Sequence, residues 1–454
     1  MTYPLLPLTE ATAHPFTHAP HRTLVTLAFP VLLSLIAEPL TGLVDTAFVS
    51  RLGATSLGAL GVGTMVLSSV IWIFNFLGIG TQTEVGQSIG GGDRDRTRRV
   101  NGLALTLSGL FGLMLLVVGL PATSLLATLM GATGDMHADA VTYIQIRWFG
   151  APAVLITVAA FGTLRGLQDM RVPLWIAVGV NVANIALDAA LIFGVGPVPA
   201  LGVAGAALAT VISQWLGAVC AGGLVFARLG RPDRFRFAEA GRLLRVGSDL
   251  FVRTGMLTLF LLLAARAATR IGAESAAAHQ AIRQFWIFTA LFLDAFGITG
   301  QSLVAYFMGA GSRNTARRVA GVVCAWSVGV GVALALAMWL GQGVVIRLLV
   351  PASAVAVFIP AWLISALSQP INALSFATDG LHWGTGDFRF LRNVMLLSTG
   401  VGAAVLFLFG SETLTAVWVV TFGWIILRAT FGVLRIWPGI GAHAPLRKPA
   451  RSSA

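Results

Sequence analysis

Twelve apolar segments, each long enough to cross a membrane, constrain this 454-residue chain more than any other feature. A helix needs about 20 residues to cross ~30 Å of hydrocarbon. The segments lie near residues 24–50, 57–89, 100–126, 141–164, 172–196, 202–228, 242–270, 275–308, 318–341, 353–381, 390–409 and 413–436. None shows the ten-residue alternation of a barrel strand, so we predict an all-α protein with twelve transmembrane helices.

The composition agrees with a membrane protein. Only 11% of the residues are charged, against about 25% in soluble domains. A globule of this size has too little interior for so many apolar residues, so we expect the lipid bilayer to cover most of the surface. The net charge of +12 could suggest nucleic acid, but the basic residues gather at the ends of the apolar segments, and we exclude nucleic-acid binding.

The basic residues also predict the orientation. If the N-terminus is cytoplasmic, 22 of the 30 Lys and Arg residues lie in cytoplasmic segments, and only Arg51, Arg270 and Arg347 lie outside. The other five lie within spans: Arg147, Arg253, Arg266, Arg283 and Arg428. This bias places both termini in the cytoplasm of a multi-pass protein of the cell membrane. Because 29 of the 30 are Arg and only Lys448 is Lys, the sequence is typical of a GC-rich bacterial genome. We therefore expect the membrane to be a bacterial inner membrane.

The chain contains an internal repeat. A shift of 219 residues aligns 51–102 with 270–321 without a gap. The shared residues include Arg51/Arg270, Gly78/Gly297, Gln82/Gln301, Arg94/Arg313 and Arg98/Arg317. Apolar composition does not explain arginines in register, so we infer a duplication.

The repeat predicts the domain organisation. With six spans each, both halves begin and end on the same side, which makes the repeats parallel and suits alternating access around a central cleft. We predict an N-lobe at 22–229, a cytoplasmic loop at 230–241, a C-lobe at 242–437, and cytoplasmic tails at 1–21 and 438–454.

Two acids lie within the first span, where a charge is costly. Glu38 and Asp45 are seven residues apart, which places both carboxylates on one helix face. Two prolines in the same span remove backbone donors, so we expect this helix to bend. The repeat equivalents of the acids are Leu257 and Ala264, so the acids belong to the first lobe alone.

The fifth span supplies a second polar cluster. Asn181, Asn184 and Asp188 follow at spacings of three and four and share one face. Together with the first-span acids they suit a proton or a small hard cation such as Na⁺, because no His or Cys accompanies them. We therefore expect H⁺ or Na⁺ as the coupling ion and no other cofactor. The alternative is that the acids pair with arginine or backbone groups and only stabilise the helices.

Weaker signals mark candidates for a substrate-binding cleft. They are Tyr143, Asp294, Asp379, Gln82 and Gln301. Tyr143 opens the fourth span and could instead anchor it at the membrane interface. Arg253, Arg266 or Arg283 could neutralise the two acids structurally. We expect Glu84, near the inner end of the second span, to reach water.

Several segments carry a family resemblance. LVDTAFVSRLGATSLGALGV, RGLQDMRVPLW, NIALD, GVAGAALATVISQW and LDAFGITGQSLVAYFMGAG together resemble the multidrug and toxic compound extrusion (MATE) transporters, in their DinF-type branch. The resemblance runs from about residue 24 to 436. It implies two six-helix lobes and the export of organic cations or amphiphilic toxic compounds in exchange for H⁺ or Na⁺.

The resemblance also implies roles for individual residues. The coupling acid of the family falls on Asp45, its fifth-helix pair on Asn184 and Asp188, and its sixth-helix threonine on Thr210. These four residues could hold Na⁺, and a fourth-helix tyrosine of some relatives matches Tyr143. Many relatives have a carboxamide where this chain has Glu38, and this departure leaves the coupling ion open.

The sequence disfavours three alternatives to a transporter of this kind. A lipid-linked oligosaccharide flippase would need a strongly cationic cleft, which the first-lobe acids oppose. An intramembrane enzyme would need a nucleophile with its base or a metal triad, and the sequence shows neither at membrane depth. A single ion cluster suits occlusion better than conduction by a channel. The sequence shows no phosphate-binding loop, so we expect an ion gradient and not nucleotide to drive transport. We also expect a monomer that is not an enzyme.

Overall fold

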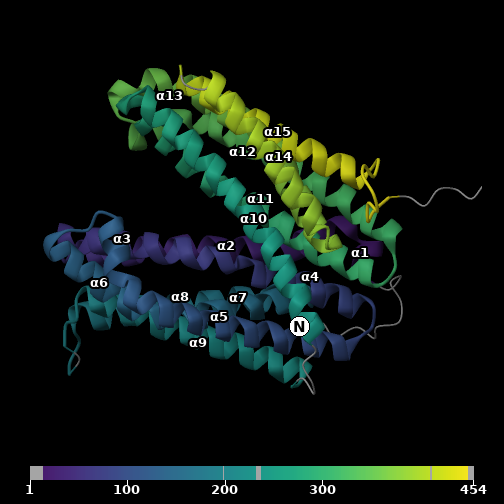
Figure 1. The fold of residues 1–454 in the computed structure, drawn as a ribbon, viewed down its shortest axis with the longest axis horizontal. Coiled ribbons are helices and arrows are strands. Elements are labelled where there is room, and N and C mark those ends of the chain that lie inside the picture. The colour runs from purple at the N-terminus through teal and green to yellow at the C-terminus, as the bar shows by residue number, and fades with distance from the viewer. Residues whose placement is uncertain (1–13, 198, 232–236, 410–411, 448–454) are drawn as a thin grey trace, which may run out of the picture. The chain divides into compact units, whose positions relative to one another are not determined.

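The computed structural model describes residues 14–197, 199–231, 237–409 and 412–447, and every regular element within them is a helix (Figure 1). The elements are α1(Pro15–His18), α2(Pro20–Ser50), α3(Ala54–Trp72), η2(Ile73–Asn75), α4(Phe76–Gly90), α5(Arg94–Leu129), α6(Gly134–Trp148), α7(Ala151–Gly166), α8(Arg171–Phe193), α9(Val203–Leu229), α10(Phe237–Ile271), α11(Ala273–Gly309), α12(Arg313–Leu349), η3(Ala352–Ala354), α13(Val355–Thr385), α14(Phe388–Phe409) and α15(Leu414–Ile436).

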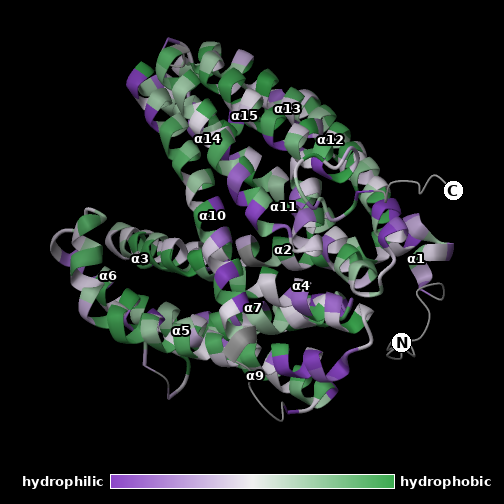
Figure 2. Cartoon of the chain, turned by 45° about the vertical axis from the view of Figure 1, so that its right-hand side comes forward, coloured by the Kyte–Doolittle hydropathy of each residue, from purple (hydrophilic) through white to green (hydrophobic). Residues whose placement is uncertain are grey.

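The helices agree with the predicted spans. In the described residues, 11 helices are long and apolar enough to cross a membrane, and the bent pair α6 and α7 makes 12. The second span comprises α3, η2 and α4, and the fourth is the pair, bent by 48°. Most of the residues along the helices are hydrophobic (Figure 2), and large side chains such as Phe407 and Leu340 are 84% and 76% exposed. Such a surface suits lipid and not water, so the chain is a multi-pass helical membrane protein.

The chain forms two compact units. Unit 2 comprises residues 33–247, and unit 1 comprises residues 1–32 together with 248–454. These borders differ from the predicted lobe boundaries because they fall inside α2 and α10 rather than in loops. The first turns of α2 belong to unit 1 because Leu24 and Ala28 are buried in one core cluster with Leu303 and Phe307 of α11.

The same close helix crossing occurs in both units. A Cβ atom on Gly162 of α7 would lie 2.4 Å from the Gly78 carbonyl oxygen of α4, and one on Gly380 of α13 would lie 2.1 Å from that of Gly297 in α11. Only glycine allows two backbones to approach so closely. The duplication is therefore visible in the packing as well as in the sequence.

A second crossing repeats in the same way. Gly112 of α5 packs against Pro152 of α7, where an added Cβ would lie 2.2 Å from the proline Cα. Gly331 of α12 meets Pro370 of α13, with a corresponding distance of 2.7 Å. The glycines keep the 219-residue shift of the repeat, which extends it beyond the segment that aligns by sequence.

Two arginines that match in the repeat, just before the third and ninth spans, make the same kind of contact in both units. Arg98 of α5 donates to the carbonyl of Leu229, at the end of α9, at 2.8 Å. Arg317 of α12 donates to Ile436 and Trp437, at the end of α15, at 3.3 and 3.0 Å. The last carbonyls of a helix lack partners within that helix, so each arginine caps the last helix of its own unit.

The described parts of both predicted tails pack within unit 1. Phe16 of α1 is fully buried in the same cluster as Phe307, and Leu446 belongs to it as well. Arg317 donates to the Leu446 carbonyl at 3.0 Å. These stretches of 1–21 and 438–454 are therefore part of the folded protein, while residues 1–13 and 448–454 lie outside the described residues.

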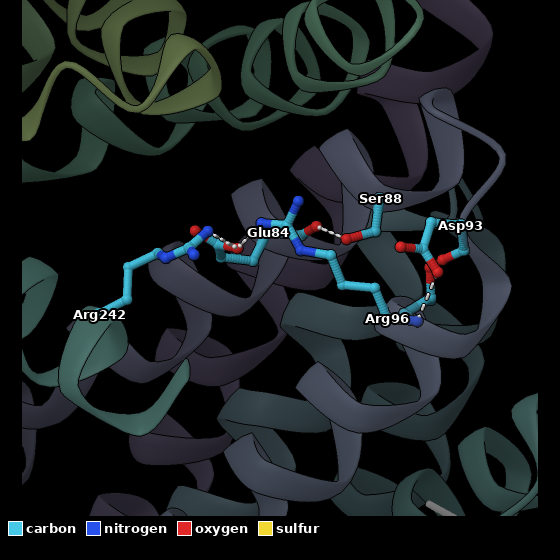
Figure 3. Close-up of polar contacts among 6 residues, drawn as sticks. Glu84, Ser88, Asp93, Arg96 and Arg242 are labelled. Atoms are coloured by element: carbon cyan, nitrogen blue, oxygen red, sulfur yellow. Dashed lines mark hydrogen bonds and ion pairs between the residues drawn. The ribbon is translucent and has the colours of Figure 1, made fainter. Parts of the chain in front are cut away.

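Glu84 of α4 is held in ion pairs, whereas the sequence led us to expect contact with water. Its carboxylate contacts Arg96 of α5 at 2.6 Å and Arg242 of α10 at 3.6 Å (Figure 3), and the side chain is only 14% exposed. Both arginines lie in segments that the orientation rule assigns to the cytoplasm. The pair of contacts joins the first turns of α10 to unit 2.

Candidate functional site

Asp45 of α2 meets Asn184 and Asp188 of α8 inside unit 2. The Asn184 amide nitrogen donates to Asp45 Oδ1 at 3.1 Å and to Asp188 Oδ2 at 2.6 Å. Asp188 is fully buried, Asn184 is 2% exposed, and Asp45 is partly buried. The spacing of four in α8 places Asn184 and Asp188 on one face, and the structure turns that face toward Asp45.

The Asn184 amide bridges the two carboxyl groups, which lie close enough to act on each other electrostatically. Asp188 Oδ1 is buried and receives no hydrogen bond from the part of the chain that the structure describes. Ionised carboxylates only accept hydrogen bonds, and two of them at close range repel each other. The pair therefore suits a shared proton or a bound cation.

Arg147 is the nearby charge that the sequence did not connect with the acids. It lies at the end of α6, acts electrostatically on both Asp45 and Asp188, and donates to Gln214 Oε1 of α9 at 2.9 Å. Within the described chain, neither acid forms an ion pair with an arginine at 4.0 Å or less. The acids are thus influenced by a positive charge without being locked to it. The sequence signal was its position inside a span.

The break between α6 and α7 is held by α9. A Cβ atom on Gly150 would lie 2.3 Å from Gln214 Oε1, so glycine is needed for that side chain to reach Arg147. Trp215 donates to the Phe149 carbonyl at 3.0 Å. Interrupted helices are tolerated at membrane depth only where neighbouring groups satisfy the backbone, and here α9 supplies the donor.

Three other residues predicted for ion coupling have different surroundings. Asn181 donates to the Ala37 carbonyl of α2 at 2.9 Å, which ties α8 to the first span. Thr210 donates to the Ala206 carbonyl of its own helix at 2.9 Å. The side chain of Glu38 lies outside the described residues. Their roles in ion coupling stay predictions.

The predicted acids of the second half lie in unit 1 among arginines. Asp379 of α13 is ion-paired with Arg253 of α10 and, at 2.8 Å, with Arg428 of α15. Asp294 of α11 acts electrostatically on Arg428. Arg253 was one of the partners considered from the sequence, whereas Arg428 was not. The acid and both arginines come from three helices that are distant in the chain.

The remaining cleft candidates lie at tight helix contacts. Tyr143 is buried in the core cluster of unit 2, where its ring leaves no space for a Cβ on Gly63. Gln82 and Gln301 are buried at equivalent positions of the two units, and their backbone carbonyl oxygens face glycines of α7 and α13. Their contact with a substrate stays a prediction.

Repeated helical units with ionisable side chains buried at membrane depth define a class, the multi-pass membrane proteins built for transport. The comparison with known families agrees. The MatE family model matches residues 30–190 and 251–408, one segment for each repeat. The chain belongs to this family, whose members are transporters and not enzymes.

Individual relatives cover most of the chain. Protein DETOXIFICATION 44, chloroplastic, of Arabidopsis thaliana is 30% identical over 91% of this chain and 81% of its own length. DNA damage-inducible protein F of Escherichia coli (strain K12) is 26% identical over 82% of each chain. The crystal structure of MATE in the bent conformation superposes with a TM-score of 0.83 at 21% identity, covering 91% of this chain and 94% of that one. This last likeness supports the two-lobed helical fold.

Proposed function

We propose that this protein exports organic cations or amphiphilic toxic compounds in exchange for a cation, by alternating access. The observation that carries the proposal is the buried contact of Asp45, Asn184 and Asp188. Two interacting carboxyl groups with one unsatisfied oxygen favour the uptake of a positive charge. Family membership supports transport, and the acid pair supports coupling to an ion.

We propose H⁺ as the coupling ion, with Na⁺ as the alternative. Asn184 presents its amide nitrogen to both carboxylates, so its carbonyl oxygen is not the atom directed at them. A sodium ion between the acids would need oxygen ligands, whereas a proton shared by two carboxyl groups leaves the amide donor in place.

The coupling step follows from linkage. Loading a proton on the pair reduces the repulsion between Asp45 and Asp188 and so favours whichever state holds them in contact. Losing it favours the state that separates them. An ion shifts such an equilibrium only by its difference in affinity for the two states.

The cellular context is part of the same proposal. We propose that the protein is a monomer of a bacterial cytoplasmic membrane with both termini in the cytoplasm. The excess of basic residues in the segments that would face the cytoplasm supports this orientation. The lobe boundaries at 22–229 and 242–437 remain our prediction for the units that move.

Proteoliposomes loaded with a fluorescent organic cation test the proposal. A pH gradient and a Na⁺ gradient are imposed in turn on wild type, on Asp45→Asn and on Asp139→Asn as the control. Asp139 is an acid of α6 that accepts from Ser56 Oγ at 3.2 Å and lies outside the site. We expect the pH gradient to drive flux in wild type and in the control but not in Asp45→Asn. Flux that is equal in all three and independent of either gradient would contradict exchange.

A further inference from the structure

A row of buried polar side chains runs along α13 within unit 1. Ser365, Gln369, Asn372, Ser375 and Asp379 follow at spacings of three and four, which places them within about a third of the helix circumference. The first four are fully buried. α13 is the central helix of this unit and packs against α11, α12 and α15.

Several polar side-chain atoms of this row have no hydrogen-bond partner among the described residues. The Asn372 amide has none for either its nitrogen or its oxygen within the described structure. The hydroxyls of Ser365 and Ser375 and the Gln369 carbonyl oxygen are also unpartnered there. A buried polar group without a partner costs about 1–3 kcal/mol, so several in one row indicate that another molecule satisfies them.

The row ends at two arginines with spare donors. Arg253 and Arg428 both bind Asp379, yet Nε of each and Nη1 of Arg428 are buried without an acceptor among the described residues. The Arg428 side chain is only 2% exposed. Trp383 and Trp424 lie against the faces of the two guanidinium groups, at 5.1 and 4.6 Å.

An aromatic ring thus covers one face of each guanidinium group, while N–H groups at its edge lack an acceptor among the described residues. A guanidinium donates in its plane and has no acceptor atom, so only an acceptor can complete these groups. Asp294 also acts on Arg428, so the local charge is close to balanced. The requirement is therefore for hydrogen-bond acceptors beside two arginines, which a carboxylate meets best.

We propose that unit 1 contains a binding site for a small organic carboxylate, held by Arg253 and Arg428 with Asn372 further along α13. The aromatic rings beside both arginines favour a ligand whose carboxylate is attached to an apolar ring. Asn372 lies seven residues from Asp379, about 10 Å along the helix, and serves a second polar group of a longer ligand. The site goes beyond the proposed cation exchange and does not need it.

Binding to the purified full-length protein in detergent tests the site without any gradient. The probes are benzoate, benzylamine and benzamide, which share one ring and differ in charge. Their dissociation constants are measured by ligand-observed NMR. We expect benzoate to bind at least about tenfold more tightly than benzamide, as a charge-assisted hydrogen bond requires, and benzylamine to bind most weakly.

Two substitutions shift benzoate affinity in opposite directions. Arg428→Lys keeps the charge but removes spare N–H donors, and should weaken benzoate about tenfold. Asp379→Asn removes the competing carboxylate and should strengthen it. Arg435→Lys is the matched control, because Arg435 lies seven residues further along α15 and its hydrogen bonds go to Asp387, Ile440 and Ala442. It should leave benzoate affinity unchanged.

The outcomes are decisive for this site alone. Equal affinity for benzoate and benzamide in wild type would mean that water satisfies the row, and it would overturn the proposal. Unchanged benzoate affinity in Arg428→Lys would overturn it as well. If Arg428→Lys or Asp379→Asn does not yield monodisperse protein, Asn372→Leu is tested in the same assay. 4-Hydroxybenzoate is then added as the longer probe. In that variant we expect weaker binding of 4-hydroxybenzoate and unchanged binding of benzoate. None of these results depends on ion-driven flux, which tests the proposed function separately.

Discussion

Adding one methyl group at the glycine crossings should destabilise each unit. Gly162→Ala would place a Cβ 2.4 Å from the Gly78 oxygen, and Gly380→Ala would place one 2.1 Å from the Gly297 oxygen. Real Cβ contacts stay above 3.0 Å. The obstructing atoms belong to a helix backbone and not to the end of a flexible side chain. The helices must therefore separate to accept the methyl group.

The size of the effect follows from two opposing terms. Overpacking of this kind costs typically about 1–3 kcal/mol, and loss of the close helix contact adds to it. Alanine in place of glycine within a helix recovers at most about 1 kcal/mol. We expect a net loss of about 1–2 kcal/mol, larger for Gly380→Ala because its contact is shorter.

Thermal unfolding in detergent, followed by tryptophan fluorescence, measures the change. Gly109→Ala in α5 is the matched control, because nothing lies within 4 Å of its added Cβ. Only the propensity gain acts there, so its melting temperature should stay equal or rise while both crossing variants melt lower. If the melting temperatures of Gly162→Ala and Gly380→Ala equal or exceed that of wild type, the close crossings do not stabilise the packing within each unit.

Three further predictions concern single contacts. Trp362→Phe removes an indole hydrogen bond of 3.0 Å to a buried backbone carbonyl and should cost about 1 kcal/mol, seen as a lower melting temperature. Arg228→Gln breaks a 2.6 Å pair with Asp169 whose side chains are 30% and 25% exposed; we expect under about 1 kcal/mol, shrinking in high salt. N-ethylmaleimide should modify exposed Cys220 much faster than buried Cys324, as peptide mass spectrometry can measure.

Each of these has a result that would contradict it. An unchanged melting temperature for Trp362→Phe would mean that the indole N–H contributes no net stability. A loss that is equally large at high salt would show that Arg228 acts through packing rather than charge. Equal labelling of the two cysteines would show that the helices around Cys324 open readily enough to expose its thiol.

The sequence predicted the candidate site in part. Asn184 and Asp188 share a face because the period of a helix is fixed, and Asp45 could be chosen because an acid inside an apolar span is costly. The approach of Arg147 and Gln214 could not be predicted, since it depends on the break at Gly150 and on the position of α9. No local pattern encodes which helices become neighbours.

The fate of the other acids shows the same division. Glu84 lies near the end of a span, and the sequence alone favoured contact with water. The fold instead brings Arg96 and Arg242 against it from two other helices. Asp379 could have served a cleft or paired with one of several arginines, and only the packing of α10 and α15 against α13 selects Arg253 and Arg428.

The sequence by itself determined that the chain spans a membrane many times, that its elements are helices, and that its halves are duplicates. These properties follow from hydropathy, residue periodicity and self-similarity, all of which are local or linear. Only the tertiary structure decided which charged side chains lie close together, where the compact units divide, and which buried donors lack acceptors. Those properties depend on distances between residues far apart in the chain, which helix packing sets and a linear pattern does not contain.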